Sequence, residues 1–512
     1  MMNKLKIFIN NHFNIFAFIM FTLIVFSLYG RTLFFDFSYY DDDVLVLDRQ
    51  EYLSFSNIDK IFSNTIFGES TDQFCRPILN LTFLFEKYLY GIKPFGYHLT
   101  NLLLHLFAVF SIYLLLTLRY DKKKTFILCL LFACHPAIVQ AVAWIPGRND
   151  SLLALFVVLS FYFFIKYIQD NRASFMFAYL FCFVLSLLTK ETAIVIPFFY
   201  LLFLVYKRQN IKKIIICMII WILITLLYLL YRKYVLSGQY VATFKDMFTN
   251  FYKALIPATP KYIANIFFPI KLSVFPAMLK VNYLLCTASF LVFVLLFIKL
   301  RSYDLRIVIF GFCCFFFFLF PTYLMTDNDF YDHRIYIPLM GILLVVSEMI
   351  RNYFGMYSKK IVAIIVFFFL MFCSVTLYYE QKFHNKETFW VNALMMSPES
   401  DLANAMVGQL FFECGLYKEA EERYLKAISI KPTSTHYGNL AVVYAKIGDL
   451  DNTEKALLKA LEFARNNPNT YYNLALVYKY KGDKEKAQEM KEKYIETFNK
   501  TNKVSKMVDI DL

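Results

Sequence analysis

Charged residues are scarce in this 512-residue chain: they make up 18% of it, whereas about a quarter is usual in a soluble globular protein. Apolar residues fill the difference at 59%, aromatic residues reach 20%, and the mean hydropathy is +0.49. This composition excludes an ordinary soluble domain. It predicts a polytopic membrane protein.

Two further patterns are missing. The ten cysteines show no metal-binding spacing, and most fall inside apolar segments, where a thiol packs as a small hydrophobe. The net charge of +14 comes from dispersed basic residues, so no nucleic-acid partner is expected. A divalent metal cofactor stays open, because the sequence does not require one.

Long apolar runs dominate what is present. A membrane-spanning helix needs about 20 apolar residues. Eleven segments approach this length: residues 7–29, 98–118, 125–145, 151–168, 173–189, 191–206, 211–233, 282–299, 306–324, 335–350 and 361–380. The first is too long for a signal-peptide core and no small-residue cleavage site follows it, which predicts an uncleaved anchor with a cytoplasmic N-terminus.

Basic residues mark every second loop, as expected for loops that stay on the cytoplasmic side. Five such clusters are Arg119 with Lys122, Lys123 and Lys124; Lys166 with Arg172; Lys207, Arg208, Lys212 and Lys213; Lys299, Arg301 and Arg306; and Arg351, Lys359 and Lys360. The alternation places residues 30–97, the loop 325–334 and everything after about residue 381 on the outer side. A Lys-, Ile- and Phe-rich style favours a bacterial inner membrane, although an endoplasmic-reticulum protein would look similar.

A repeat of 33 to 34 residues follows the last apolar segment. Gly415, Gly448 and Gly482 recur at this period, as do Phe411, Tyr444 and Tyr478. This is the tetratricopeptide period, in which each helix pair buries one face on the next pair. The predicted fold is therefore all-α: a membrane helical bundle over residues 1–390 and three repeats, at about 401–433, 434–467 and 468–500. Such arrays bind peptides or act as scaffolds, and the groove residues name no ligand.

Three adjacent acids, Asp41, Asp42 and Asp43, follow the first span on the predicted outer side. An exposed loop or a helix N-cap would also use such residues. Three carboxylates beside a membrane and opposite several arginines nevertheless indicate a functional site.

Other polar residues lie at the outer ends of spans, where lipid penalises unpaired polar groups. The topology brings together Arg76, Arg148, Asp150, Lys190, Glu191, Asp332, His333 and Arg334. Three histidines lie deeper: His98 and His105 share a helical face with Asn101, and His135 precedes a proline. For these histidines a hydrogen bond to a neighbouring helix, or a kink, is the simpler interpretation. Lys190 and Glu191 are equally compatible with a turn between two spans.

Five stretches carry a family resemblance: YYDDDVLVLD, RPILNLTFLFEKYLYGIKPFGYHLTNLLLH, HPAIVQAVAWIPGRND, LSLLTKETAIVIP and DHRIYIPLMG. In this order, and followed by the repeats, they resemble the transmembrane and tetratricopeptide-repeat glycosyltransferases, which have the GT-C membrane fold. The resemblance implies a polyprenyl-phosphate sugar donor, and Asp41 and Asp42 match the family's acidic pair. Relatives usually carry Glu in place of Gln140 and commonly in place of Asp332, so proton transfer at position 140 is in doubt.

The chemistry of these residues fits a transferase. Asp41 or Asp42 would accept the proton of an acceptor hydroxyl, with Asp43 as a pKa-raising neighbour or a metal ligand. The leaving lipid phosphate would be met by Arg76, Arg148, Lys190 or Arg334. A single displacement predicts inversion at the sugar, and the repeats would recruit an acceptor protein.

Two other classes of protein stay open at this stage. A non-catalytic, membrane-anchored adaptor is favoured by Gln140, which cannot act as a base. A transporter is disfavoured, because the charged residues lie at one interface and not at the bilayer midplane.

Overall fold

The computed structural model describes residues 12–67, 74–236, 244–269, 272–275, 287–288, 291, 303–324, 331–352 and 358–501. Every regular element within these ranges is helical, which confirms the predicted fold class. The chain divides into two compact units, one of residues 1–274 and 280–389 and the other of residues 275–279 and 390–512. The predicted span 282–299 lies outside the described residues apart from three positions.

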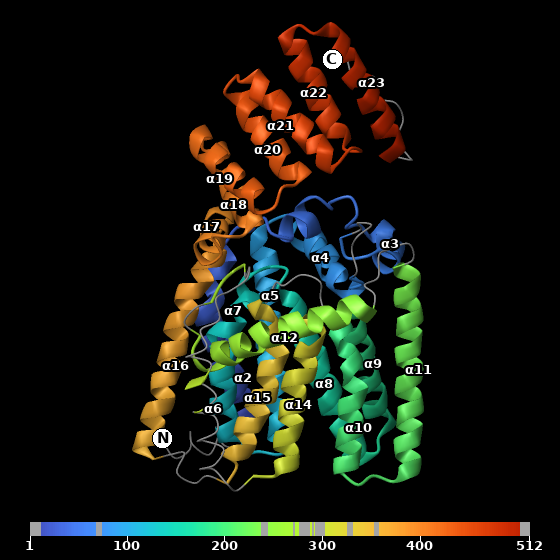
Figure 1. Ribbon diagram of the computed structural model, residues 1–512. Helices are drawn as coiled ribbons and strands as arrows, with labels where there is room; N and C mark the ends of the chain where they lie inside the picture. Colours follow the sequence, from blue (N-terminus) through green and yellow to red (C-terminus); the bar gives the residue numbers. More distant parts are fainter. Residues whose placement is uncertain are drawn as a thin grey trace. The chain divides into compact units, whose positions relative to one another are not determined.

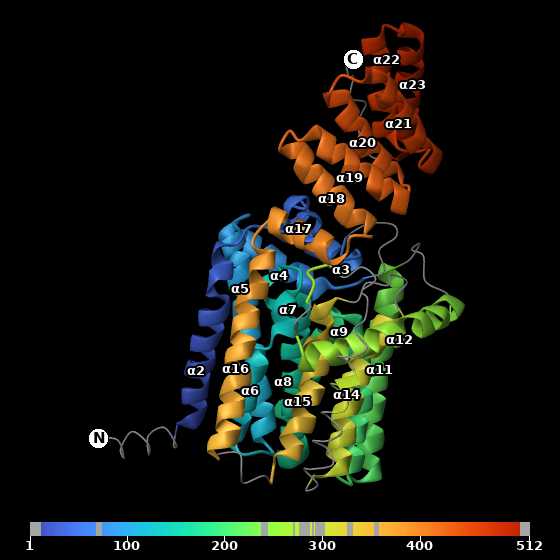
Figure 2. The same ribbon diagram turned by 60° about the vertical axis from the view of Figure 1, so that its left-hand side comes forward.

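The first unit is a helical bundle (Figure 1). Its longer helices are α2 (Phe13–Tyr29), α4 (Pro77–Tyr90), α5 (Pro94–Thr117), α6 (Lys122–Ala133), α8 (Arg148–Asp170), α9 (Ala173–Thr189), α10 (Ile196–Tyr206), α11 (Ile211–Val235), α12 (Phe244–Phe267), α14 (Leu305–Tyr323), α15 (Tyr336–Met349) and α16 (Lys359–Glu380). Most of them run side by side, whereas α12 lies across the bundle in both Figure 1 and Figure 2.

Among the described residues, six helical stretches are long and apolar enough to cross a membrane. They are Phe13–Phe34, Pro94–Thr117, Arg148–Asp170, Ile211–Val235, Leu305–Tyr323 and Lys359–Phe383. The pair Lys122–Ala133 and Pro136–Ala143, bent by 56°, is a seventh if its two parts form one span and not a re-entrant loop. The chain is thus a multi-pass membrane protein, and the number of eleven spans stays a prediction.

Two glycines bring α14 and α15 into close contact. A Cβ atom on Gly341 would lie 2.5 Å from the carbonyl oxygen of Gly311, and one on Gly311 would lie 2.7 Å from the carbonyl oxygen of Gly341. Such pairs of small residues let helix backbones approach each other in membranes, where packing has to replace the hydrophobic effect. This contact fixes α15, whose first turn follows Asp332, His333 and Arg334.

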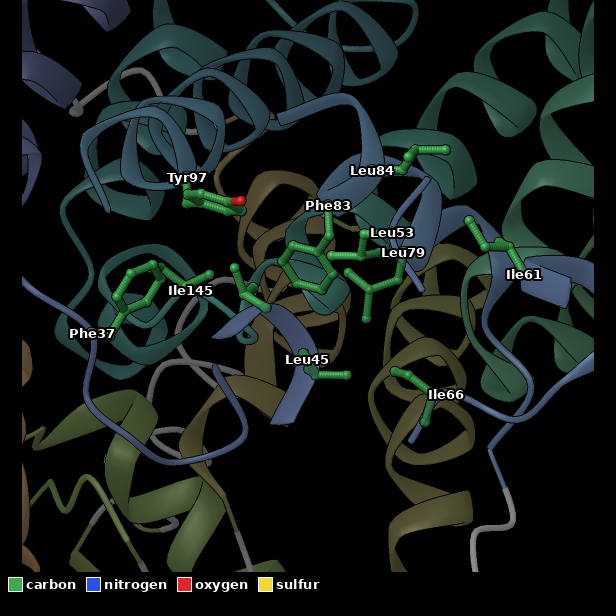
Figure 3. Packing of buried hydrophobic residues seen from close by; sticks show 11 residues of the cluster. Phe37, Leu45, Leu53, Ile61, Ile66, Leu79, Phe83, Leu84, Tyr97 and Ile145 are labelled. Carbon is green, nitrogen blue, oxygen red and sulfur yellow. The ribbon is translucent and has the colours of Figure 1, made fainter. Parts of the chain in front are cut away.

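The segment between α2 and α4 folds over its own apolar core. Phe37, Leu45 and Ile61 of this segment are each at most 4% exposed. They pack with further residues of the segment and of the bundle in one cluster (Figure 3): Val46, Leu53, Ile66, Leu79, Phe83, Leu84, Tyr97 and Ile145. Burial of these side chains ties the acid-bearing segment to α4 and α5, so Asp41 to Asp43 belong to a packed structure.

The second unit contains the predicted repeats. Its helix pairs are α18 (Asp401–Glu413) with α19 (Tyr417–Ile430), α20 (Ser434–Lys446) with α21 (Leu450–Phe463), and α22 (Pro468–Lys481) with α23 (Lys484–Thr501). Gly415, Gly448 and Gly482 join the helices of each pair at φ values of +77°, +82° and +79°. Only glycine adopts this region without steric cost, which explains the periodic glycine in the sequence.

Candidate active site

The three acids lie on a tight turn, residues 36–43, here called the acidic loop. Asp42 holds this loop together: its carboxylate accepts hydrogen bonds from the backbone N–H of Ser38 (2.6 Å) and of Tyr40 (2.8 Å) and from the Ser38 hydroxyl (2.9 Å). Tyr39 and Asp41 take left-handed φ values of +54° and +64°. Non-glycine residues persist in this region only where surrounding contacts enforce it, and such strain is frequent at functional sites.

Asp41 differs from Asp42 in its contacts. No described residue donates a hydrogen bond to the Asp41 carboxylate. Withdrawal from water and the negative charges of Asp42 and Asp43 raise the pKa of Asp41 to about 7, and the positive charge of Arg76 opposes the rise. Burial raises the pKa of Asp42 to about 7 as well, so the unengaged carboxyl group of Asp41, and not its pKa, distinguishes it as the general base.

Three of the four predicted phosphate-binding cations interact electrostatically with one another, and one of them, Arg76, also acts on Asp41. Both Arg76 and Arg334 act on Lys190. Arg76 pairs with Glu191 at 3.2 Å, and Lys190 pairs with Asp150 at 2.7 Å. Two of the predicted anionic residues, Glu191 and Asp150, thus hold two of the cations in place.

Asn149 adds a further support to Arg76. With its amide turned to satisfy both neighbours, its oxygen accepts from Arg76 Nη1 at 2.9 Å and its nitrogen donates to the Thr189 carbonyl at 3.1 Å. The turn after α9 and the start of α8 therefore position the same guanidinium.

His333 also belongs to this cluster of charged residues. Its Nε2 lies 3.8 Å from the Asp150 carboxylate, and its Nδ1 has no partner among the described residues. Burial, together with the positive charges of Lys190 and Arg334, holds the pKa of His333 well below its usual range. The ring is therefore neutral at pH 7, with one nitrogen available to a ligand.

A group of aromatic rings borders the acids, and the sequence reasoning missed its role. Tyr40 stacks on Trp144, with 5.6 Å between ring centroids, and the Tyr40 carbonyl accepts a hydrogen bond from the indole Nε1–H at 3.1 Å. Tyr331 stacks on His333 at 5.3 Å and meets Tyr40 through both hydroxyls. A sequence signal existed: each of these aromatic residues stands within four residues of a predicted polar site residue.

Asp332 and Gln140 make supporting contacts at the site. Asp332 accepts from the Asn265 amide at 2.9 Å and pairs with the buried Lys261 at 3.4 Å. The Gln140 side chain accepts from the His333 backbone N–H at 3.0 Å and donates to the Val274 carbonyl at 2.8 Å. The Gln140 amide provides both a hydrogen-bond donor and an acceptor, whereas an ionised glutamate at this position could only accept.

Arg148, the fourth predicted phosphate-binding cation, has a different environment. It is wholly buried, and its guanidinium pairs with Glu86 at 2.5 Å and donates to the carbonyls of Tyr97 (2.8 Å) and Ile145 (3.2 Å). With its donors engaged in this way, we infer a structural role for Arg148 in place of the phosphate contact predicted from the sequence.

The three deeper histidines also make structural contacts. His105 meets the Tyr336 hydroxyl at 2.7 Å and the Ala133 carbonyl at 3.1 Å, and His135 meets the Ile266 carbonyl at 2.9 Å. His98 packs edge-on against Phe35. The contacts of His105 and His135 agree with the simpler interpretation, whereas the ring nitrogens of His98 have no hydrogen-bond partner among the described residues. Within the described ranges, no group of three or more His, Cys, Asp or Glu side chains is arranged to hold a metal ion.

Gly147 forms the turn before α8, and we expect that it tolerates no side chain. A Cβ atom there would lie 2.2 Å from the Gln140 carbonyl oxygen. Gly147→Ala should destabilise the protein by about 1–3 kcal/mol, the usual effect of overpacking. The measurement is the thermal unfolding midpoint in detergent, with Gly30→Ala as the control, because nothing lies within 4 Å of a Cβ there. Equal midpoints for the two variants would contradict the expected clash.

Comparisons with known proteins agree with both parts of this fold. The family described as dolichyl-phosphate-mannose-protein mannosyltransferase matches residues 79–232, and tetratricopeptide repeats match residues 403–434 and 432–500. The first match contains Arg148, Asp150, Lys190 and Glu191. The acidic loop and residues 332–334 lie outside it.

Several curated proteins are similar over part of their length. Protein O-mannosyl-transferase TMTC2 of Homo sapiens is 35% identical over 158 residues, which are 29% of this chain and 18% of that protein. TMTC3 of Mus musculus is 32% identical over 150 residues (28% and 16%), and Tmtc3 of Drosophila melanogaster is 28% identical over 194 residues (31% and 20%). The matches thus span a fifth or less of the relatives' own length.

One solved structure, the crystal structure of MamA, covers 31% of this chain and 92% of its own at 18% identity and a TM-score of 0.22. A TM-score this low does not establish a shared fold. The sequence matches confirm the resemblance predicted above: one segment of the chain matches the dolichyl-phosphate-mannose-protein mannosyltransferase family, tetratricopeptide repeats follow it, and the chain is similar to protein O-mannosyl-transferases.

Proposed function

We propose that this protein is an integral-membrane glycosyltransferase that moves a sugar from a polyprenyl-phosphate donor to a hydroxyl group of an acceptor protein. One observation carries the proposal: an unengaged carboxyl group, Asp41, is acted on by the charge of Arg76, and Arg76 in turn interacts electrostatically with Lys190, on which Arg334 also acts. Glycosyl transfer from a lipid phosphate needs a base that deprotonates the incoming hydroxyl. It also needs positive charge that stabilises the departing phosphate.

In the proposed reaction, Asp41 accepts the proton of a Ser or Thr hydroxyl on the acceptor. The oxygen of that hydroxyl bonds to the anomeric carbon of the sugar at the same time. The bond from that carbon to the phosphate oxygen breaks, and the electron pair leaves with the lipid phosphate. Arg76, Lys190 and Arg334 balance the charge that develops there. One displacement inverts the anomeric centre. The apolar helices of the bundle would accommodate the polyprenyl chain.

The basic inner loops support an outer location for this chemistry. Arg119, Lys124 and Lys213 belong to clusters at the end of the bundle that the positive-inside rule assigns to the cytoplasm. The acidic loop follows the C-terminal end of α2, which lies at the other end of the bundle from these basic clusters (Figure 2). We propose that the site faces the extracytoplasmic side, where it would meet an acceptor protein.

Gln140 no longer favours a non-catalytic adaptor. Its amide is used at both ends, for the His333 backbone and for the Val274 carbonyl, so the position holds structure and needs no basicity. The base in this proposal is Asp41, which the chain retains.

Activity should depend on pH through Asp41. A base works only when deprotonated, and the pKa of Asp41 is raised to about 7. We expect the transfer rate to fall about tenfold for each pH unit below 7 and to level off above it. The measurement is kcat/KM between pH 5 and 9 at constant ionic strength. A rate that stays constant down to pH 5 would exclude Asp41 as a base with this pKa.

Removal of the repeats should affect the acceptor more than the chemistry. Deletion of residues 400–512 is expected to raise the KM for a protein acceptor by about tenfold, a loss of about 1.4 kcal/mol of binding, with kcat and the donor KM little changed. Steady-state kinetics with a protein and with a short peptide acceptor would separate the effects. If the deletion leaves the protein-acceptor KM unchanged, the repeats do not recruit the acceptor.

The test of the proposed donor is direct. Protein reconstituted in liposomes is incubated with an acceptor and with either polyprenyl-phosphate sugars or nucleotide sugars. The proposal predicts label on the acceptor only with the lipid-linked donors, together with free polyprenyl phosphate and an inverted anomeric centre. Transfer from nucleotide sugars alone, or retained configuration, would contradict it.

A further inference from the structure

The segment that leads from α16 into the repeats runs along the segment that carries Asp41. The first, residues 377–389, is here called the connector; it comprises the end of α16, the 3-10 turn Gln381–Phe383 and the first turn of α17 (Lys386–Met396). The second, residues 31–40, leads from α2 into the acidic loop. Both belong to the first unit.

Contact between them begins at a buried acid. Arg31 donates to Glu380 Oε1 through Nε (3.1 Å) and Nη2 (2.8 Å), and Nη2 also reaches the Leu377 carbonyl at 3.1 Å. The Glu380 side chain is 0% exposed, whereas that of Arg31 is 53% exposed. A buried carboxylate without a cation is strongly unfavourable, so this pair fixes the start of the segment.

The contacts continue in the same order along both segments. The backbone N–H of Asp36 donates to the His384 carbonyl at 2.8 Å, and the Phe35 ring packs on the His384 ring at 5.0 Å. Further on, Lys386 Nζ lies 5.4 Å from the centre of the Tyr39 ring.

The last contact lies next to the proposed base. Phe389, which is 0% exposed, stacks on Tyr40 at 5.6 Å. The start of α17 sets its position: the Asn385 side chain accepts from the Thr388 N–H at 2.9 Å, and the Thr388 hydroxyl accepts from the Asn385 N–H at 3.2 Å. This reciprocal cap fixes the helix start. Phe389 therefore lies in the fixed first turn of α17 and packs on Tyr40, the residue that precedes Asp41.

We propose that the connector is a positioning element for the acidic loop, and that Phe389 and Glu380 are positioning residues that hold Asp41 in its productive place. After the connector the chain passes through the rest of α17 to α18, so the segment that positions the base also leads into the repeats. The packing is independent of the enzyme's chemistry, whereas the role in catalysis rests on the proposed function of Asp41.

The test uses the full-length protein in detergent and two variants. Phe389→Leu removes the stacked ring, and Arg31→Gln breaks the ion pair. Because Arg31→Gln leaves the buried Glu380 without its cation, the unfolding midpoint of this variant is measured as well, and Phe389→Leu decides the test if that midpoint falls. Lys382→Ala is the matched control, because Lys382 lies in the connector and its described contact is with Tyr378. Arg31→Lys restores the charge and should recover the behaviour of the unaltered protein.

Hydrogen exchange of the amides of residues 36–43, measured by mass spectrometry, should be at least about tenfold faster in both variants and unchanged in the control. Misplacement of a reacting group by about 1 Å costs up to about a hundredfold in rate, so kcat should fall by about tenfold to a hundredfold while the donor KM stays within about twofold. Unchanged exchange in both variants overturns the proposal, as does faster exchange with unchanged kcat. If the unaltered protein transfers no sugar, the proposed function fails, and exchange alone then decides whether the connector holds the loop.

Discussion

Asp41→Asn should lower the rate of sugar transfer by about a hundredfold to ten-thousandfold, the contribution expected of a general base. The substitution keeps the size of the side chain and removes its ability to take a proton. No described residue donates to the Asp41 carboxylate, so the amide should break no structural hydrogen bond. Expression, the unfolding midpoint and the donor KM should therefore stay as in the unaltered protein.

Asp42 provides the informative comparison. Its carboxylate accepts three hydrogen bonds within the acidic loop, so Asp42→Asn should lower activity by loosening the loop. Faster hydrogen exchange of residues 36–43 should accompany that loss. Asp41→Asn should reduce activity without it. Equal exchange in both variants, with the larger loss of activity in Asp42→Asn, would assign the base to Asp42.

Arg334→Gln should produce the second large effect, a loss of about a hundredfold to a thousandfold in kcat, because a charge-stabilising donor in a dry site is worth that much in the transition state. We choose Arg334 among the three cations, because the ion pairs of the other two make their variants unsuitable. Lys190 and Arg76 are held by Asp150 and Glu191, so their removal would leave buried acids uncompensated and destabilise the fold. Arg334 rests on the Tyr331 ring at 5.2 Å.

The matched control is Arg306→Gln, which makes the same chemical change at an exposed side chain paired with Asp304. It should leave the rate unchanged. Arg334→Lys keeps the charge and should recover part of the loss. Equal activity of Arg334→Gln and Arg306→Gln would remove Arg334 from the proposed phosphate site.

The sequence predicted the features that repeat or that stand out locally. Long apolar runs predicted the spanning helices, and the 33- to 34-residue period predicted the repeats, because glycine is needed at each left-handed turn such as Gly448. Three adjacent acids after the first span pointed to the acidic loop. Each of these signals lies within one short window of sequence.

Long-range pairs could not be predicted in the same way. Arg148 looked like a phosphate ligand because its partner Glu86 is 62 residues earlier in the chain, and no local pattern linked the two residues. Lys261, which pairs with Asp332, lies in α12, a helix without any motif. The different hydrogen bonding of Asp41 and Asp42 depends on the left-handed backbone at residues 39 and 41. No sequence pattern revealed this backbone conformation.

The most direct test of the central claim is transfer of radiolabelled sugar from a panel of polyprenyl-phosphate sugars to acceptor protein, in membranes that contain equal amounts of unaltered protein or Asp41→Asn. The account predicts that at least one donor labels the acceptor with the unaltered protein and that this label drops by about a hundredfold or more in the variant. Equal labelling in the two membranes, or no donor-dependent labelling across the panel, would contradict it.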